Sequence, residues 1–442
     1  MQKRMDLPNY VSNILSSLND HGFQALVVGG CVRDALLGIE PSDYDITTNA
    51  LPDQVETIFS HTIPTGKKHG TITILTDTNM VEVTTYRIEA DYQDHRHPNS
   101  VQFVDDLVQD LARRDFTINA MAYHPEVGLV DPFGGQSDLE KGLIRAVGDA
   151  NKRFEEDALR MLRAHRFASR YHFQIEAKTL SAIQACTPYI TSISVERIRS
   201  ELTKILAYNP YEIENMTQLL SHWMPELEAC RACTQTTPYH DTNVLHHILR
   251  ACALLPTFDE TLAYALLMHD LAKPACKTTK DGKDHFKGHP VLGYTIAKRI
   301  CHDFKLTNVQ KRTIPNLVLY HDEKCSDPLA FIAKMRIERG FDDAFMQQLL
   351  LVKYCDIMAH SAYGQRTIVK WKKLKEVYAD CQEMRPMAIT DLAINGKDVF
   401  LTTNCEKAQI KPILKEILLD CFYHPQKNQS EDLLKELREK YR

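Results

Sequence analysis

Residues 26–50 combine a glycine turn with two spaced carboxylates, and few folds accommodate both within 25 residues. A short apolar strand ends at a Gly-Gly pair at 29–30, a helix carrying Arg33 follows, and a second strand is expected to hold Asp43 and Asp45. Alternate residues of a strand share a face, so these two carboxylates can bind a divalent metal together. Glycines before a helix let backbone N–H groups approach an anion, and an arginine offers a planar fork to phosphate oxygens. Each signal alone is typical of an ordinary turn or strand edge, but their order predicts nucleotidyl transfer.

A third carboxylate lies on the strand expected over residues 81–87. Alternation puts Val81 and Val83 on one face of this strand and Glu82 on the other. Glu82 can join the metal-binding pair, or it can be an ordinary polar residue on a solvated strand face. Two divalent ions on such a cluster would lower the pKa of an attacking 3′-hydroxyl and stabilise a leaving pyrophosphate.

Length and composition indicate several domains and no membrane span. A chain of 442 residues is too long for one ordinary core, so two to four domains are expected. Its 44% hydrophobic and 25% charged residues are typical of a globular protein in water. No apolar run reaches transmembrane length, and the first residues predict an amphipathic helix rather than a leader. The 12 cysteines show no spacing typical of a disulfide framework, which fits a reducing cytoplasm. The net charge of −5 argues against a broad nucleic-acid-binding surface and allows only a local basic groove.

Residues 151–171 predict one helix, with apolar residues close to helical spacing. Asp157 and Arg160 lie one turn apart on it, and Arg163 follows on the adjoining stripe. A carboxylate only accepts hydrogen bonds and a guanidinium only donates them, so the pair matches the amino group and bare ring nitrogen that cytosine and adenine share. Uracil and guanine would leave polar groups unpaired at roughly 1–3 kcal/mol each. The alternative is a surface ion pair, which contributes little.

A second set of metal-type ligands lies in the later half of the chain. In order these residues are His247, His269, Asp270 and Asp356, with His289 and His321 as additional candidates. A lone histidine is usually structural, but six such residues are hard to dismiss. Imidazoles and carboxylates suit Mn, Fe, Ni, Co or Zn better than a dedicated magnesium site.

The chain resembles the class II tRNA nucleotidyltransferase and bacterial poly(A) polymerase family. The resemblance rests on residues 26–50, on LARRDFTINAMAY at 111–123 and on Glu-Asp-x-x-Arg at 156–160. It implies an α+β fold class, with a polymerase-β-like nucleotidyltransferase head built on a mixed sheet with helices, then an all-α neck, an HD-type body and a tail. The implied domains are a head at 1–138, a neck with a nucleotide-templating motif at 139–210, an HD-type body at 211–378 and a tRNA-binding tail at 379–442.

The resemblance also implies roles for individual residues. Catalysis is expected from Asp43, Asp45 and Glu82, with Asp43 and Asp45 on Mg²⁺. Nucleotide binding is expected from Gly29, Gly30, Arg33, Arg114, Asp115, Asn119, Glu156, Asp157, Arg160 and Arg163. An exposed, flexible loop at 86–104, with Arg87, Glu89, Tyr92, Asp94 and Arg96, would be needed for adding the terminal A, which disfavours an enzyme that adds only CC. Arg197 and Glu201 are expected to brace the neck helices.

In the later half, the order of histidines and aspartates resembles the HD phosphohydrolase superfamily. Two interpretations stay open: a working phosphodiesterase or phosphatase, and an inherited helical scaffold that binds metal without turnover. In the tail, residues 404–409 replace the family's Gly-rich turn. Basic residues between 366 and 375 are candidates for phosphate contacts.

The implied function is template-independent addition of CCA to tRNA 3′ ends in the cytoplasm, from CTP and ATP and with two Mg²⁺ ions. No obligate protein partner and no membrane is implied. The alternatives are an A-adding enzyme or poly(A) polymerase with the same head, or a chain that is mainly an HD phosphohydrolase of RNA ends or nucleotides.

Overall fold

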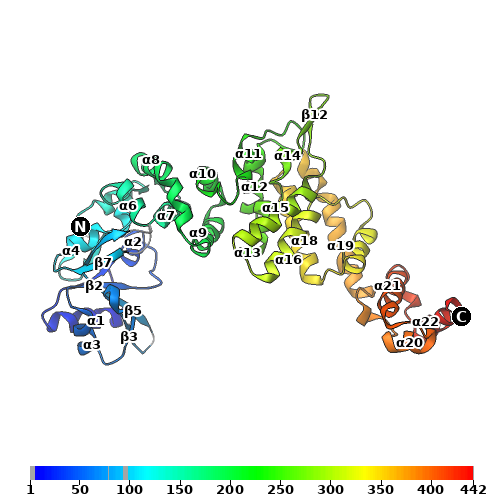
Figure 1. Cartoon of the computed structure of the whole chain (residues 1–442), viewed down its shortest axis with the longest axis horizontal. Coiled ribbons are helices and arrows are strands. Elements are labelled where there is room, and N and C mark those ends of the chain that lie inside the picture. The colour runs from blue at the N-terminus through cyan, green and yellow to red at the C-terminus, as the bar shows by residue number, and fades with distance from the viewer. Residues whose placement is uncertain (1–4, 78, 93–97, 442) are drawn as a thin grey trace. The chain divides into compact units, whose positions relative to one another are not determined.

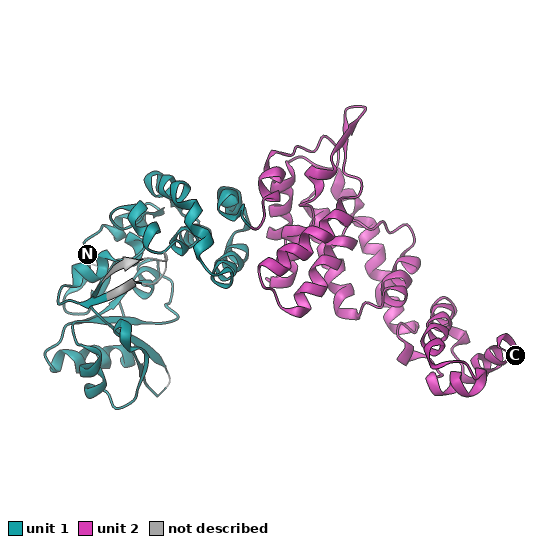
Figure 2. Ribbon diagram, in the orientation of Figure 1, with its two compact units in different colours: residues 1–222 teal, residues 223–442 magenta. Residues whose placement is uncertain are grey.

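The computed structural model describes residues 5–77, 79–92 and 98–441, and of these it leaves out the side chains of 89–92 and 98–100. The chain divides into two compact units, Met1–His222 and Trp223–Arg442 (Figure 2). The four-part division expected from the sequence stays a prediction beside this two-unit division.

A seven-stranded mixed sheet forms the centre of the first unit (Figure 1). In the sheet order β3-β4-β5-β2-β1-β8-β9 its strands are Thr62–Gly66, Thr71–Leu75, Met80–Thr85, Asp45–Thr48, Ala25–Val28, Ala122–His124 and Gly128–Val130. Strands β2 and β5 run parallel, and the other neighbouring pairs are antiparallel. This sheet and its helices confirm the α+β head expected from the sequence.

The glycine turn lies between a buried strand and a short helix. All four residues of β1 are buried, and Gly29 ends the strand with a φ of 78°, which glycine adopts without steric cost. Helix α2 (Gly30–Leu36) begins at the next residue. Helix α1 (Asn9–Asp20) packs on β1 through Val11, Ile14, Leu15 and Leu18, which share one helical face. The turn is therefore held by the core of the head.

The segment expected to be a flexible loop contains two paired strands. Strands β6 (Arg87–Tyr92) and β7 (Pro98–Phe103) run antiparallel. The expectation of a loop was wrong for these strands, because main-chain hydrogen bonds between strands do not require the apolar period that the segment lacks. Of the five residues expected to act there, Arg87, Glu89 and Tyr92 belong to β6, and Asp94 and Arg96 lie outside the described residues.

The predicted helix at 151–171 is broken in two at Asp157. Helix α6 (Ala150–Glu156) ends there, Asp157 is extended with a φ of −138°, and α7 (Leu159–Tyr171) follows. The break occurs because Asp157 Oδ1 accepts a hydrogen bond from the Leu159 main-chain N–H at 3.0 Å, which is how aspartate caps a helix start. Helix α7 packs against α9 (Val195–Tyr208).

Helices dominate the second unit, as the sequence predicted (Figure 1). Those around the HD residues are α12 (Val244–Ala253), α13 (Glu260–Met268), α15 (His289–Asp303), α16 (Asn308–Tyr320), α18 (Asp343–Ala359) and α19 (Ile368–Met384). A small hairpin, β12 (Thr278–Lys280) and β13 (Lys283–His285), interrupts them. Among the described residues, none of the helices is both long enough and apolar enough to cross a membrane.

The tail consists of α20 (Gly396–Thr403), α21 (Lys407–Tyr423) and α22 (Ser430–Lys440). In the segment 404–409 that replaces the family's glycine-rich turn, Asn404 takes the left-handed conformation with a φ of 52° and ends α20. Asparagine tolerates this conformation better than most side chains, which is how the turn forms without glycine.

Candidate active sites in the head and the body

Three carboxylates of the head gather at the parallel pair β2 and β5. Asp45 begins β2 and is in register with Glu82 of β5. Asp43 precedes the strand instead of lying on it, because pairing with β1 stops at Asp45. The buried Tyr44 separates two exposed aspartates, so both lie on the accessible side. Partial desolvation by surrounding protein atoms, with the charges of Asp43 and Glu82, raises the pKa of Asp45 to about 6 against the opposing charge of Arg114. This excess of negative charge fits a divalent cation.

The Gly29 turn leaves room for Arg114. A Cβ atom on Gly29 would come within 2.8 Å of Arg114 Nη1, so a side chain here would displace the guanidinium. Gly30 opens α2, and the first N–H groups of a helix lack partners within the helix. Main-chain donors and a cation thus adjoin the carboxylates, an arrangement that suits a triphosphate.

Arg33 contacts protein acceptors through the fork that the sequence predicted for phosphate. Its Nε donates to Asp34 Oδ1 at 2.8 Å, and its Nη1 donates to Asn119 Oδ1. The guanidinium also lies 5.0 Å and 4.9 Å from the ring centroids of Phe167 and Tyr171 on α7. The residue is 4% exposed and joins α2 to the neck.

Asp115 binds a neck arginine. Its Oδ2 accepts from Arg163 Nε at 2.8 Å, and its Oδ1 accepts from Asn119 Nδ2 at 3.0 Å. Burial opposes ionisation of this carboxyl, but Arg163, the Asn119 hydrogen bond and Arg160 outweigh it and hold the pKa of Asp115 well below its ordinary value. The structure therefore brings together three residues predicted for nucleotide binding.

The expected base-reading pair is held by other partners. Arg160 is 9% exposed and donates to Glu156 Oε2 at 2.9 Å and to the main-chain oxygens of Arg153 and Arg113. Asp157 accepts from Arg197 Nη2 at 3.3 Å. A second ion pair links the neck helices, in which Glu201 Oε2 accepts from Arg166 Nε at 2.5 Å. Arg197 and Glu201 therefore both contact neck residues, as expected.

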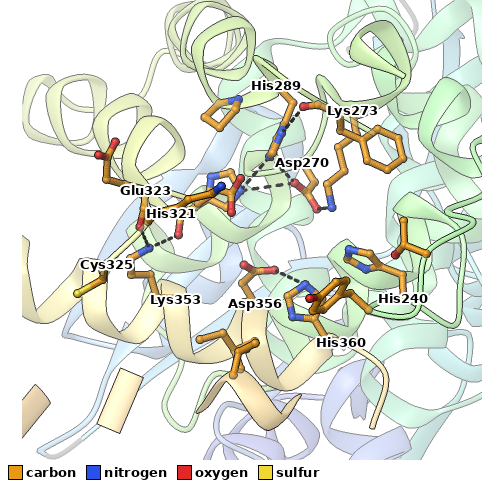
Figure 3. Close-up of a pocket in the computed structure, with 18 of the residues that line it drawn as sticks. His240, Asp270, Lys273, His289, His321, Glu323, Cys325, Lys353, Asp356 and His360 are labelled. Atoms are coloured by element: carbon orange, nitrogen blue, oxygen red, sulfur yellow. Dashed lines mark hydrogen bonds and ion pairs between the residues drawn. The ribbon is translucent and has the colours of Figure 1, made fainter. Parts of the chain in front are cut away.

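The HD residues converge in the second unit. Among the described residues, three groups of imidazole and carboxylate ligands have their ligand atoms within 4.8 Å of one another: His247, His269, Asp270 and Asp356; Asp270, His289 and His321; and His240, His247 and His360. His247 Nε2 lies 3.0 Å from Asp356 Oδ1 and 3.4 Å from Asp270 Oδ2. His247 lies on α12, Asp356 on α18 and His289 at the start of α15, while His269 and Asp270 follow α13 and His321 follows α16. Tertiary packing therefore brings all six predicted ligands together, and Figure 3 labels four of them: Asp270, His289, His321 and Asp356.

Two histidines of this site were missed from the sequence. His240 and His360 form a ligand group with His247, His360 Nε2 lies 3.8 Å from Asp356 Oδ1, and the ring centroids of His240 and His247 are 4.8 Å apart (Figure 3). Burial, then Lys273 and the neighbouring rings, lower the pKa of His240 to about 2, so its ring is neutral. The only sequence signal for His360 is its spacing of one helical turn from Asp356.

A cavity of about 890 Å³ opens beside the HD cluster. Its lining includes Asp270, His289, His321 and Asp356 together with Lys273 and Trp371. Lys273 Nζ lies 2.6 Å from Asp270 Oδ2, so a cation already faces the carboxylate. The volume is that of an ordinary small-molecule site.

Three family models match the chain. They are the poly A polymerase head domain at residues 25–145, the probable RNA- and SrmB-binding site of polymerase A at 172–230, and the HD domain at 239–358. Domains of the first and third kinds generally use divalent metals, which fits the ligand groups described above.

Several relatives of this chain are named CCA-adding enzymes. The chain is 50% identical over 218 residues to one from Geobacillus thermodenitrificans, covering 48% of this chain and 54% of that one, and 51% identical over 193 residues to one from Staphylococcus aureus, covering 44% and 48%. These matches span about half the length of each relative. A crystal structure of the Bacillus stearothermophilus CCA-adding enzyme with CTP is 28% identical, with a TM-score of 0.69 over 97% of this chain and 96% of that one. The matched domains and these relatives confirm that the chain resembles the class II tRNA nucleotidyltransferase and bacterial poly(A) polymerase family and carries an HD domain.

Proposed function

We propose that the head and neck add CMP, CMP and AMP in turn to immature tRNA 3′ ends, using CTP and ATP. The observation that carries this proposal is the pairing of Asp45 with Glu82 on neighbouring strands, next to the Gly29 turn and Arg114. The likeness to CCA-adding enzymes, one of them with CTP, supports the choice of substrates. In each step the terminal 3′-oxygen bonds to the α-phosphorus of the nucleotide, and the bond from that phosphorus to pyrophosphate breaks. The proton of the 3′-hydroxyl passes to water.

Asp43 and Asp45, with Glu82 beside them, would hold Mg²⁺ in this reaction, because magnesium prefers carboxylate oxygens. When bound, two such ions neutralise triphosphate charge and favour ionisation of the 3′-hydroxyl. The Gly30 main chain and the Arg114 guanidinium would position the triphosphate, while the Gly29 N–H donates to the Met121 main-chain oxygen at 3.0 Å and so fixes the turn. Arg33 would support this site without contacting the triphosphate. Its guanidinium donates to Asp34 and Asn119 and so holds α2 in place.

We also propose that Asp157 and Arg160 select the incoming base. The three hydrogen bonds of Arg160 fix its plane and leave two of the five guanidinium N–H groups for a ring nitrogen. Asp157 uses its oxygens for Leu159 and Arg197, and each carboxylate oxygen can accept a further hydrogen bond from an amino group. Asp115 and Asn119 remain candidates for the ribose.

Incorporation assays test the head. Transcripts of one tRNA that lack CCA, or end in C or CC, are incubated with labelled CTP or ATP and Mg²⁺. Completion of all three to CCA, followed by a stop, is expected. The exposed Asp53 provides the matched control: Asp45→Asn should abolish incorporation, and Asp53→Asn should leave it unchanged. Addition of A only to the transcript that ends in CC would identify an A-adding enzyme, and long A runs would identify a poly(A) polymerase.

A second candidate function is favoured by the HD cluster and its cavity. Here the chain would hydrolyse a phosphate ester: the oxygen of water bonds to phosphorus, the ester P–O bond breaks, and a proton of the water goes to the leaving oxygen. Because the ligands are imidazoles and carboxylates, a transition metal such as Mn²⁺ or Ni²⁺ is the expected ion. If the body is instead a scaffold that binds metal without turnover, no hydrolysis is expected.

The hydrolase is tested with 2′,3′-cyclic AMP and Mn²⁺ or Ni²⁺. His269→Ala should remove turnover, whereas His302→Ala should not, because the His302 side chain is 83% exposed and lies outside the cluster. An unchanged rate in His269→Ala would refute catalysis by this site. We place both activities in the cytoplasm, where the 12 cysteines, all free thiols here, would stay reduced.

A further inference from the structure

Two arginines of the neck hold the end of helix α4 (Leu107–Ala112) in the head. Arg153 Nη1 donates to the main-chain oxygen of Ala112 at 3.2 Å, and Arg160 Nη2 donates to that of Arg113 at 3.0 Å. The last carbonyls of a helix lack partners within the helix, and basic side chains can satisfy them. Two successive carbonyls of the head are therefore bound by neighbouring elements of the neck.

Glu156 connects these two arginines. Its Oε1 accepts from Arg153 Nη2 at 2.6 Å, and its Oε2 accepts from Arg160 Nη1 at 2.9 Å. The side chains of Arg153, Glu156 and Arg160 are 12%, 12% and 10% exposed. Hydrogen bonds between ionised groups are short and strong, and removal from water strengthens them further. The three side chains thus form one cluster, in which the position of Arg160 depends on that of Arg153.

The carbonyls that this cluster binds lead directly into residues proposed to bind the nucleotide. Arg114 and Asp115 follow them in the chain. The Arg114 guanidinium lies at the glycine turn, since a Cβ atom on Gly29 would come within 2.8 Å of its Nη1. A shift of the carbonyls at 112 and 113 would therefore move Arg114 away from the triphosphate position, and misplaced groups slow a reaction steeply.

We propose that Arg153 is a positioning residue for nucleotide selection, which acts through Glu156 and Arg160 to couple base reading to Arg114. A base that hydrogen-bonds to Arg160 would hold this arginine, and with it the carbonyl of Arg113, in place. A mismatched base would leave the segment free to shift. Selection of C and A would then appear in the rate of incorporation as well as in binding. This inference rests on the proposed function of the head and neck.

Nucleotide preference tests the role of Arg153. Incorporation is measured with the full chain and Mg²⁺, using ATP and GTP on the transcript that ends in CC, and CTP and UTP on the transcript that lacks CCA. Arg153→Ala should lower kcat for ATP and CTP roughly 10-fold, as expected for loss of a hydrogen bond from a charged group, and leave the slow GTP and UTP rates unchanged. Arg153→Lys keeps a cation beside Glu156 and should lose less of the preference.

The matched control is Lys152→Ala, which removes an exposed cation from the same helix, α6, and should keep the parent's rates. Circular dichroism checks that each variant is folded. A merely structural role of Arg153 would lower the rates for all nucleotides by the same factor. Equal losses for ATP and GTP in Arg153→Ala, or an unchanged preference, would therefore overturn the inference.

Hydrogen exchange separates this inference from the proposed function. The Arg114 N–H donates to the main-chain oxygen of Leu111 at 3.2 Å, so its exchange reports opening at the end of α4. Peptides covering 110–117 should exchange faster in Arg153→Ala than in Lys152→Ala, with β1 unchanged. Equal exchange at 110–117 would overturn the inference even in an active enzyme. A parent chain that adds no nucleotide would refute the proposed function, and exchange would still decide whether Arg153 holds α4.

Discussion

Replacing Asp34 by alanine tests how the first unit joins α2 to the neck helix α7. Asp34 is 6% exposed and accepts hydrogen bonds from Arg33 Nε at 2.8 Å, Arg170 Nη2 at 3.2 Å and Tyr171 Oη at 2.7 Å. Asp34→Ala would leave the guanidinium of Arg33 buried without its anion. Removing one partner of a buried ion pair costs about 3–5 kcal/mol. We expect the lower end, because Asn119 still accepts from Arg33.

Hydrogen exchange measures this loss where it should occur. A loss of about 3 kcal/mol corresponds to roughly 100-fold faster exchange of α2 and α7 amides that exchange through opening of the first unit. Both tryptophans, Trp223 and Trp371, belong to the second unit, so their fluorescence should report unchanged unfolding there. Mass spectrometry of peptides from each helix gives the rates.

The control is Asp53→Ala, which removes the surface ion pair with Lys67. The Asp53 side chain is 84% exposed, so water replaces the lost contact and exchange should hardly change. Equal exchange in Asp34→Ala and Asp53→Ala would refute the buried connection between α2 and α7. Asp34→Asn keeps an acceptor oxygen and should fall between them.

Three further predictions follow from backbone geometry, charge and metal binding. Gly29→Ala should lower the melting temperature and the incorporation rate more than Gly148→Ala. Both glycines have a positive φ, but only a Cβ atom at position 29 would contact Arg114. Equal decreases in melting temperature would contradict this prediction. The pKa of Asp115 in the folded protein is below its ordinary 3.8. The stability that this carboxylate contributes is therefore complete above pH 3.8 and is lost as the pH falls toward the folded-state pKa. The free energies of urea unfolding of Asp115→Asn and of the parent should differ at neutral pH and converge in acid. Mn²⁺ added at 100 times the Kd measured on metal-free protein should stabilise the second unit by about 2.7 kcal/mol, and tryptophan fluorescence during unfolding measures this change. An unchanged free energy of unfolding would show that Mn²⁺ does not bind preferentially to the folded second unit.

The candidate sites were predictable where the chemistry follows from residue order. The spacing of Asp43 and Asp45 and the alternation around Glu82 predicted one group of head carboxylates, and β2 and β5 do place Asp45 beside Glu82, although Asp43 precedes β2. The order from His247 to Asp356 likewise identified the HD cluster. These patterns can be recognised from neighbouring residues or from residue order, so they do not require knowledge of how the helices and strands pack.

The choice of partners was not predictable. The sequence suggested Arg33 for phosphate, but α7 places two aromatic rings against its guanidinium and α2 supplies Asp34 as its acceptor. The single predicted helix at 151–171 breaks because Asp157 caps α7, a competition between side-chain and helical hydrogen bonds that periodicity does not register.

The α+β head, the helical second half and the residue types of the two candidate metal sites all followed from local patterns in the chain. Only packing places Asp270 against two histidine pairs, groups His240 and His360 with His247, and pairs the strands β6 and β7 in the charged segment after Tyr86. The physical reason is that apolar period and motif spacing act between neighbours in the chain. Hydrogen bonds, ion pairs and ligand sets instead depend on which helices and strands pack together.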